Sequence, residues 1–185
     1  MVIKFLDSTP LANYKILSNS ITPRPIAWIS TISSAGVVNL APFSFFAPLC
    51  ATPVIFGVNI MNKGNGELKD TLINAKSTQK ITISTVQVGF LESMQQTSTE
   101  LPYDVSEATQ YAIPLESVSI HYPPMVQGSL VAFFCEFKEI LQFNQTSSTL
   151  IVEAKEVFIH DNIYTENLNF SIDNVGRVGK SFIYR

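Results

Sequence analysis

A long segment without charged side chains is the feature that most constrains how this chain can fold. Residues 25–62 contain no Asp, Glu, Lys or Arg, although charged residues make up 15% of the whole chain. Such a segment is not expected on a solvated face, because charged residues are mostly exposed. Its pattern predicts a buried sheet with strands over residues 26–32 and 37–41, joined by a turn at residues 33–36.

Several uncharged polar side chains lie inside this apolar segment. Ser30 and Thr31 end the first predicted strand, Asn39 lies in the second, and Ser44 follows it. An apolar wall that carries a few polar groups is typical of a pocket for a large, flat ligand. From periodicity alone, a plain buried sheet explains the segment equally well.

Two motifs in this chain resemble those of a known family. RPIAWIST (residues 24–31), a short turn ending in Gly36, and NLAPFSFF (residues 39–46) resemble the opening of the flavin reductase-like family, the FMN-binding split barrels. Lys69-Asp70-Thr71, followed by Leu72 and Asn74, resembles that family's second motif, KDT-L-x-N. The resemblance covers nearly the whole chain and is weakest at about residues 88–118.

The resemblance implies a fold and an architecture. It predicts a mainly β protein, an FMN-binding split β-barrel of roughly six to seven antiparallel strands with a few short flanking helices. Residues 1–185 are expected to form one domain, since the length suits a single core. Substrate specificity is expected in residues 88–118, because loops carry variation.

The first motif is expected to hold the ring end of FMN. The resemblance implies that the isoalloxazine lies against the backbone of Ser30-Thr31 and Ala41-Pro42-Phe43. It also implies that Asn39 contacts the polar edge of the ring and that Ser44 binds ribityl or phosphate oxygens.

The second motif is expected to hold the phosphate. Asp70 is a good N-cap for a helix over residues 71–76, whose first turn presents free N–H groups and a positive dipole end. Lys69 adds a charge and Thr71 a hydroxyl, which together predict a phosphate site. Local sequence alone fits a capped surface helix with a solvated lysine as well. Arg177 is expected at the phosphate end or against a nicotinamide cofactor, with Arg24 as its rival.

The expected function is that of an NAD(P)H-dependent flavin oxidoreductase. The resemblance implies hydride transfer from NAD(P)H to FMN, and then to free flavin, a partner monooxygenase or a small acceptor. No catalytic side chain is assigned, because the cofactor carries hydride chemistry. The two histidines and two distant cysteines predict no metal site. Two alternatives stay open, an FMN-binding electron-transfer flavoprotein without pyridine-nucleotide activity and a β-barrel that binds an apolar ligand.

The composition of the chain limits which binding partners are expected. The low charged content favours a homodimer that covers apolar surface. The net charge of −3 without a basic cluster argues against nucleic acid and anionic membranes. The N-terminus lacks the apolar core of a signal peptide, and prolines interrupt the longest apolar run, so a soluble cytoplasmic protein is expected. Cys50 and Cys135 are expected to be buried, reduced thiols.

The remaining elements are predicted from pattern. The predicted helices cover residues 11–17, 88–94 and 106–111, with a loop at 97–102. The predicted strands cover residues 54–59, 79–87, 117–121, 129–143 and 149–160. The strand at 79–87 is expected to be half buried, and Pro42 is expected to end its strand because it cannot donate to a ladder.

Overall fold

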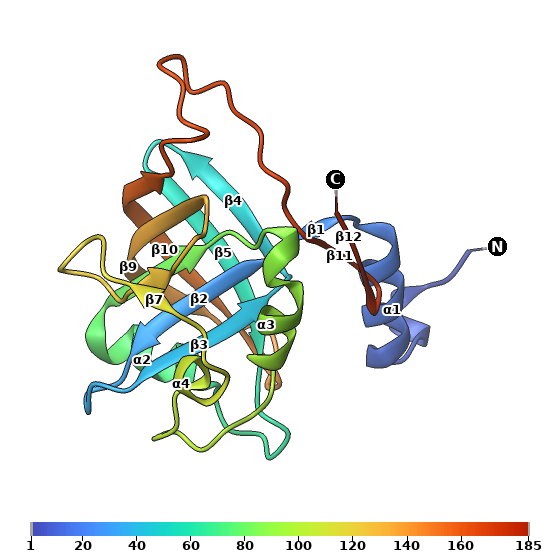
Figure 1. Cartoon of the computed structure of the whole chain (residues 1–185). Helices are drawn as coiled ribbons and strands as arrows, with labels where there is room; N and C mark the ends of the chain where they lie inside the picture. The colour runs from blue at the N-terminus through green and yellow to red at the C-terminus, as the bar shows by residue number, and fades with distance from the viewer. Residues whose placement is uncertain (1, 185) are drawn as a thin grey trace.

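A curled antiparallel sheet forms the body of the protein (Figure 1). The computed structural model describes residues 2–184. In sheet order the seven strands are β3 (Val38–Phe43), β2 (Ala27–Ile32), β6 (Lys80–Ser84), β9 (Val131–Leu141), β10 (Ser147–Ile159), β5 (Val54–Met61) and β4 (Phe46–Ala51). Each neighbouring pair runs antiparallel, which confirms the predicted mainly β split barrel.

Short helices and small sheets flank this barrel. The helical elements are η1 (Phe5–Asp7), α1 (Pro10–Ser20), α2 (Asp70–Thr78), η2 (Val88–Phe90), α3 (Leu91–Gln96) and α4 (Glu107–Gln110). The short strands are β1 (Arg24–Pro25), β7 (Leu115–Glu116), β8 (Met125–Val126), β11 (Gly176–Val178) and β12 (Ser181–Ile183). Helix α1 lies beside β11 and β12 at one side of the barrel, where both ends of the chain also lie (Figure 1).

Strand β2 is buried on both faces. Ile29 belongs to the hydrophobic cluster inside the barrel, and its neighbour Trp28 belongs to a second cluster under α3 and α4; both are fully buried. Successive residues of a strand point to opposite faces, so a strand covered on both sides is mostly apolar. The polar exceptions in β2, Ser30 and Thr31, are uncharged and hydrogen-bonded. The first part of the charge-free segment is therefore the buried sheet that the sequence predicts.

A stretch in the middle of that segment is not buried, although β5, which follows it, is part of the core. Strand β4 is the opposite edge of the sheet, and the residues from Ala47 to Ala51 are exposed. Leu49 has an exposed fraction of 57%. The prediction that Cys50 is buried is wrong, since Cys50 is exposed on this edge, whereas Cys135 is buried as expected.

Pro42 does not end its strand, contrary to the prediction. It lies within β3 and is the register partner of Trp28. The backbone N–H of Leu40, two residues earlier, points away from β2 and donates to Glu107. Position 42 faces the same outward side, so the missing N–H of proline falls where β3 has no strand neighbour.

Two further strand predictions need correction. Strand β6 begins at Lys80, because Gln79 is the left-handed C-cap of α2, with φ of 63°. It is buried on both faces rather than half buried: Thr82 donates to the carbonyl of Pro123 at 2.6 Å, so its hydroxyl is satisfied inside. Residues 117–121 are the turn between β7 and β8 rather than a strand.

The other predicted elements are confirmed with modest shifts of their ends. Helix α1 is longer than predicted, because Thr9 caps it and Pro10 occupies its first turn. The helices in residues 88–94 and 106–111, the loop between them and the long hairpin of β9 and β10 are present. The turn at residues 33–36 ends in Gly36 with φ of 84°, a left-handed conformation that suits glycine. None of the helices in residues 2–184 has the length and apolar character needed to span a membrane.

A buried hydrogen bond anchors the loop after α3 and provides a stability test. The indole N–H of Trp28 donates to Thr97 Oγ1 at 2.9 Å, and both residues are 1% exposed or less. Thr97→Val leaves the indole without an acceptor, so we expect a loss of about 1–3 kcal/mol in the free energy of unfolding. Urea denaturation measures this loss. The matched control is the exposed Thr99→Val, for which we expect a change within about 0.5 kcal/mol. Equal effects of the two substitutions would contradict the anchor.

Candidate flavin site

A buried polar network joins the two sequence motifs. Asn39, on β3, donates from Nδ2 to Thr71 Oγ1 of α2 at 2.9 Å and to Thr31 Oγ1 of β2 at 3.4 Å. Asn74 of α2 donates to the same Thr31 oxygen at 3.2 Å. All four side chains are 7% exposed or less. The network therefore fixes the first turn of α2 against the edge of the sheet.

The first turn of α2 differs from the prediction in one detail. Lys69 is the N-cap position, and Asp70 is the first helical residue rather than the cap. The Asp70 carboxylate accepts a hydrogen bond from Lys63 Nζ at 2.6 Å, and no side chain caps the helix at the N-cap position. An acidic residue in the first turn still interacts favourably with the positive end of the helix dipole.

A small pocket lies between β3, the start of α2 and the loop after α3. Its volume is about 80 Å³. Its lining includes seven of the predicted site residues, namely Asn39, Ala41, Pro42, Phe43, Lys69, Asp70 and Thr71. Two larger pockets, of about 390 and 550 Å³, share Pro42 and Phe43 with it and add Ser44. The predicted residues of both motifs therefore line adjoining pockets along the β3 edge.

Ser30 and Thr31 lie behind this surface. The Ser30 hydroxyl donates to the carbonyl of Pro124 at 2.5 Å, and Thr31 belongs to the buried network. Neither side chain is exposed. Their positions make them supports of the site, and a direct contact with a ligand stays a prediction.

The two arginines differ in position although they are register partners on β1 and β11. Arg177 lines the pocket of about 390 Å³ together with Ser44, and its guanidinium lies 4.3 Å from the centre of the Phe182 ring. Arg24 is 5% exposed and borders a different, apolar groove. Burial, followed by the nearby charge of Arg177, lowers the pKa of Arg24. Of the two rivals, Arg177 is the one that borders the candidate site.

Three charged residues of the pocket lie outside both motifs. Lys63, Glu100 and Glu107 all line it. Lys63 comes from a turn, and the two glutamates come from residues 88–118, where the resemblance is weakest. No local pattern in the sequence shows that these side chains face α2.

The carboxylates experience different surroundings. Glu100 Oε1 pairs with Lys69 Nζ at 2.5 Å, and this hydrogen bond, with a second from the N–H of Gly64, lowers the pKa of Glu100. Glu107 is 5% exposed, and burial raises its pKa despite the hydrogen bond from the N–H of Leu40 at 2.9 Å. The pocket therefore combines two lysines with two acids in ion pairs, Glu100 and Asp70, and with the buried Glu107, which accepts a hydrogen bond from a backbone N–H.

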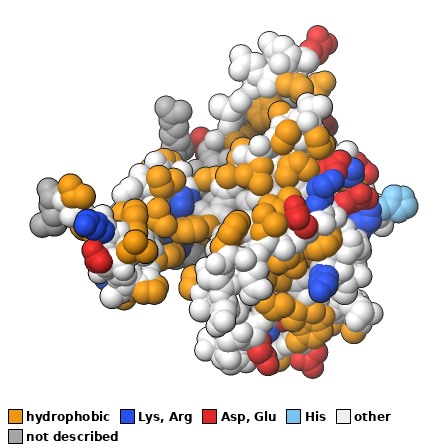
Figure 2. Space-filling model, turned by 180° about the vertical axis from the view of Figure 1, so that it is seen from behind, with side chains coloured by type: hydrophobic (Ala, Val, Ile, Leu, Met, Phe, Trp, Pro, Cys, Tyr) orange, Lys and Arg blue, Asp and Glu red, His pale blue; other side chains and the backbone are white. Residues whose placement is uncertain are grey.

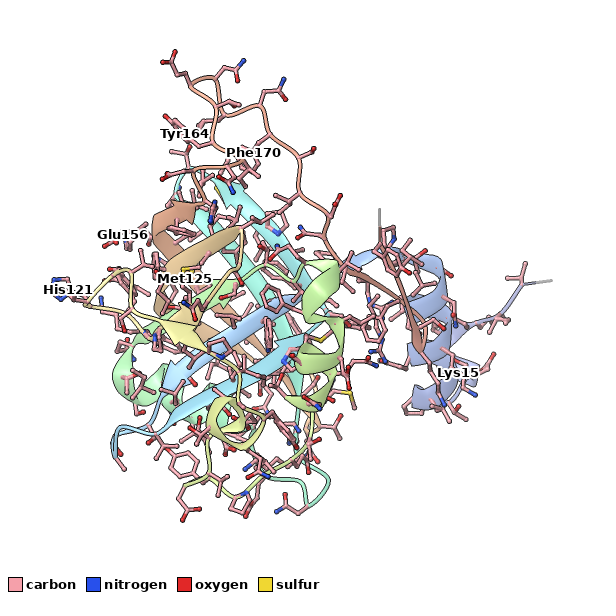
Figure 3. The ribbon with its side chains drawn as sticks, in the orientation of Figure 1. Lys15, His121, Met125, Glu156, Tyr164 and Phe170 are labelled. Atoms are coloured by element: carbon pink, nitrogen blue, oxygen red, sulfur yellow. The ribbon has the colours of Figure 1, made fainter. Side chains whose placement is uncertain are left out.

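The histidines lie elsewhere. His121 is at the tip of the β7–β8 turn and points away from the barrel (Figure 3). His160 follows β10 and its Nδ1 accepts from the backbone of Asn162. Neither lines the pockets described above.

The buried Glu107 makes stability depend on pH. Its pKa in the folded state is raised above the ordinary value of 4.5, so its favourable contribution is complete below that value and is lost as the pH rises through the folded pKa. Glu107→Gln keeps an acceptor for Leu40 and removes the charge. We therefore expect the variant to gain stability relative to the parent as the pH rises above the ordinary value of 4.5.

Chemical denaturation at a series of pH values measures this difference. Glu92→Gln, on the exposed side of α3, removes a charge without the burial and is the control. A difference between Glu107→Gln and the parent that stays constant with pH would show that Glu107 does not titrate in this range.

Comparison with known proteins agrees with this geometry. Residues 19–179 match the family model of the flavin reductase like domain. An uncharacterised protein of Aquifex aeolicus is 30% identical over 98% of this chain and 92% of its own length.

Solved structures share the fold. The structure of nitrilotriacetate monooxygenase component B from Bacillus cereus superposes with a TM-score of 0.90 at 22% identity, covering 100% of this chain and 95% of that one. An FMN-binding protein from Thermus thermophilus, with bound 1-cyclohex-2-enone, gives a TM-score of 0.79 at 17% identity, covering 99% and 96%. The match of the family model over most of the sequence shows that this chain belongs to the flavin reductase-like family.

Proposed function

We propose that the protein binds FMN along the β3 edge and acts as an NAD(P)H-dependent flavin oxidoreductase. The observation that carries the proposal is the buried network of Thr31, Asn39, Thr71 and Asn74, which places the apolar wall of the first motif beside the helix start of the second. An aromatic ring and a phosphate need surfaces of these two kinds at neighbouring positions. We also propose that residues 1–185 act as one flavin-binding unit.

The residues present fit the phosphate end of this cofactor. Helix α2 has nine residues, and Lys69 and Thr71, at its N-terminal end, both line the small pocket. A phosphate monoester is favoured by a lysine and by the N-terminus of a helix. The Asp70 carboxylate is paired with Lys63, which reduces its repulsion toward a phosphate.

The residues also fit the ring end. Ala41, Pro42 and Phe43 form an uncharged wall, and Ser44 lies where this wall meets Arg177. Both amide hydrogens of Asn39 go to the network, so its Oδ1 is the atom that would accept a hydrogen bond from the ring. Water is excluded from the side of the ring that would lie on this wall.

These contacts indicate which tasks belong to the cofactor and which belong to the protein. When bound, FMN supplies hydride and electron transfer between NAD(P)H and an acceptor. The chain's own residues bind the phosphate, orient the ring and shield one side of it. No proton transfer by a side chain is required, and none is assigned.

The names of two solved structures with the same fold suggest what could accept electrons from the flavin. One is named as component B of a monooxygenase, which supports a partner oxygenase as the recipient of reduced flavin. Another is an FMN-binding protein with a bound cyclic enone, which supports a small organic acceptor. We propose that the acceptor is free flavin, a partner monooxygenase or a small organic molecule.

We also propose a homodimer. Apolar side chains are exposed on α1 and on the edge strand β4, and a groove of about 560 Å³ lies between them. Figure 2 shows hydrophobic side chains gathered on the helical unit at the left and on the adjoining part of the barrel. A second subunit would cover this exposed apolar surface. We also propose that the protein is cytoplasmic.

Anaerobic spectroscopy tests the proposed reaction. We expect the purified protein to bind FMN and the yellow absorbance to bleach when NADH or NADPH is added. Bleaching by dithionite but by neither nucleotide would favour an electron-transfer flavoprotein instead. A protein that takes up no FMN would contradict the proposal and favour a barrel for an apolar ligand.

Lys69→Ala tests the phosphate site. Loss of a charged hydrogen bond to the phosphate is expected to weaken FMN binding by about 1.5–3 kcal/mol, or roughly 10- to 150-fold in Kd. Binding of riboflavin, which has no phosphate, should change little. Flavin fluorescence titration measures both. Lys76→Ala, in the last turn of α2, is the matched control. Equal loss of FMN and riboflavin affinity would remove Lys69 from the phosphate contact.

A further inference from the structure

Two donors beside the proposed phosphate site converge on a carboxylate of the protein itself. Lys69 Nζ binds Glu100 Oε1 at 2.5 Å, and the backbone N–H of Gly64 donates to Glu100 Oε2 at 3.3 Å. Each oxygen of the carboxylate therefore has its own donor. A phosphate monoester, with several anionic oxygens, would use the same two groups.

Glu100 is held in place by the loop that carries it. The loop begins at Thr97, which accepts from buried Trp28 and donates to the carbonyl of Met94 at 2.8 Å. The next two backbone N–H groups, of Ser98 and Thr99, donate to the carbonyls of Gln95 and Gln96 at 3.1 Å. The turn is thus fixed to the core at its start and delivers Glu100 to the mouth of the pocket.

The contact itself is accessible. The side chains of Lys69 and Glu100 are 24% and 44% exposed, so water can reach the ion pair. Exposed ion pairs contribute little to stability and can exchange for another partner of equal charge. The residues from Thr97 to Leu101 line the same pocket as Lys69 and Thr71, so an anion held in this pocket would lie beside Glu100 as well as Lys69.

We propose that Glu100 is an internal competitor for the phosphate of the flavin, so that FMN binds Lys69 only when the carboxylate moves away. The inference rests on the proposed function, since it deepens the same site. A tethered competitor has a high effective concentration and lowers the apparent affinity for the free ligand. Glu100 thus keeps FMN exchangeable, which suits a flavin that is taken up and released rather than held permanently.

The other carboxylates of the pocket do not compete for Lys69. Asp70 is paired with Lys63, and Glu107 accepts from the backbone of Leu40 on the inner side of the pocket. Of the carboxylates that line this pocket, Glu100 is the one that contacts Lys69. Its removal therefore changes the anion site without breaking the pair that supports the start of α2.

The test compares FMN with riboflavin on matched variants by flavin fluorescence titration. Glu100→Gln should tighten FMN by about three- to tenfold, because an ion pair of this exposure and its repulsion of the incoming phosphate are both removed. Riboflavin affinity should stay within about twofold. Glu92→Gln has the same change in net charge and should leave both affinities unchanged.

A double variant separates competition from simple repulsion. In a Lys69→Ala background the charged donor that both anions share is gone and the weaker Gly64 N–H remains, so the gain from Glu100→Gln should fall well below that in the parent. An equally large gain in FMN affinity in the Lys69→Ala background would contradict competition for Lys69. Equal FMN affinities of the parent and Glu100→Gln would overturn the inference while leaving FMN binding established. No FMN binding by either protein would overturn the proposed function and the inference together.

Discussion

The bonds that Asn39 makes with Thr31 and Thr71 are the constraint on which the candidate site depends. They connect a strand edge to a helix that begins about thirty residues later, and they do so without charge. A buried polar group that loses its partner is costly, so such a network fixes one arrangement of the two elements. Tyr103 extends it by donating to Asn74 Oδ1 at 2.7 Å, which ties in the segment before α4. The position of Lys69 relative to the apolar wall follows from these contacts.

Sequence reasoning recovered the parts of this arrangement that are local. The pattern of residues 26–32 identifies β2, and the two motifs identify the elements that the network joins. Because β2 is buried on both faces, it carries no charged residue, and this charge-free pattern identifies it. Helix α2 is recognised because its start combines a lysine, an acid and a hydroxyl residue in succession.

Features that depend on the environment of an element were not predictable in the same way. Pro42 reads as a strand end unless β3 is known to be an edge, and Thr82 reads as solvent-facing unless the Pro123 carbonyl is known to cover it. Cys50 lies in an apolar sequence, yet β4 leaves it exposed. Glu100 and Glu107 reach the pocket through folding of residues 88–118, and nothing in their local sequence specifies that direction.

The outer rim of β3 has a consequence for what can associate with it. At position 40 the outward amide is already engaged by Glu107, and at position 42 proline supplies none. The carbonyl oxygens of these two residues face the same side, because the N–H and C=O of a strand residue point together. A peptide that extends the sheet must both give and receive hydrogen bonds, and it would find no free N–H donor at positions 40 and 42. The two carbonyl oxygens can still accept hydrogen bonds from a small ligand that has N–H or O–H groups. Edge-to-edge pairing of two barrels through these positions is disfavoured.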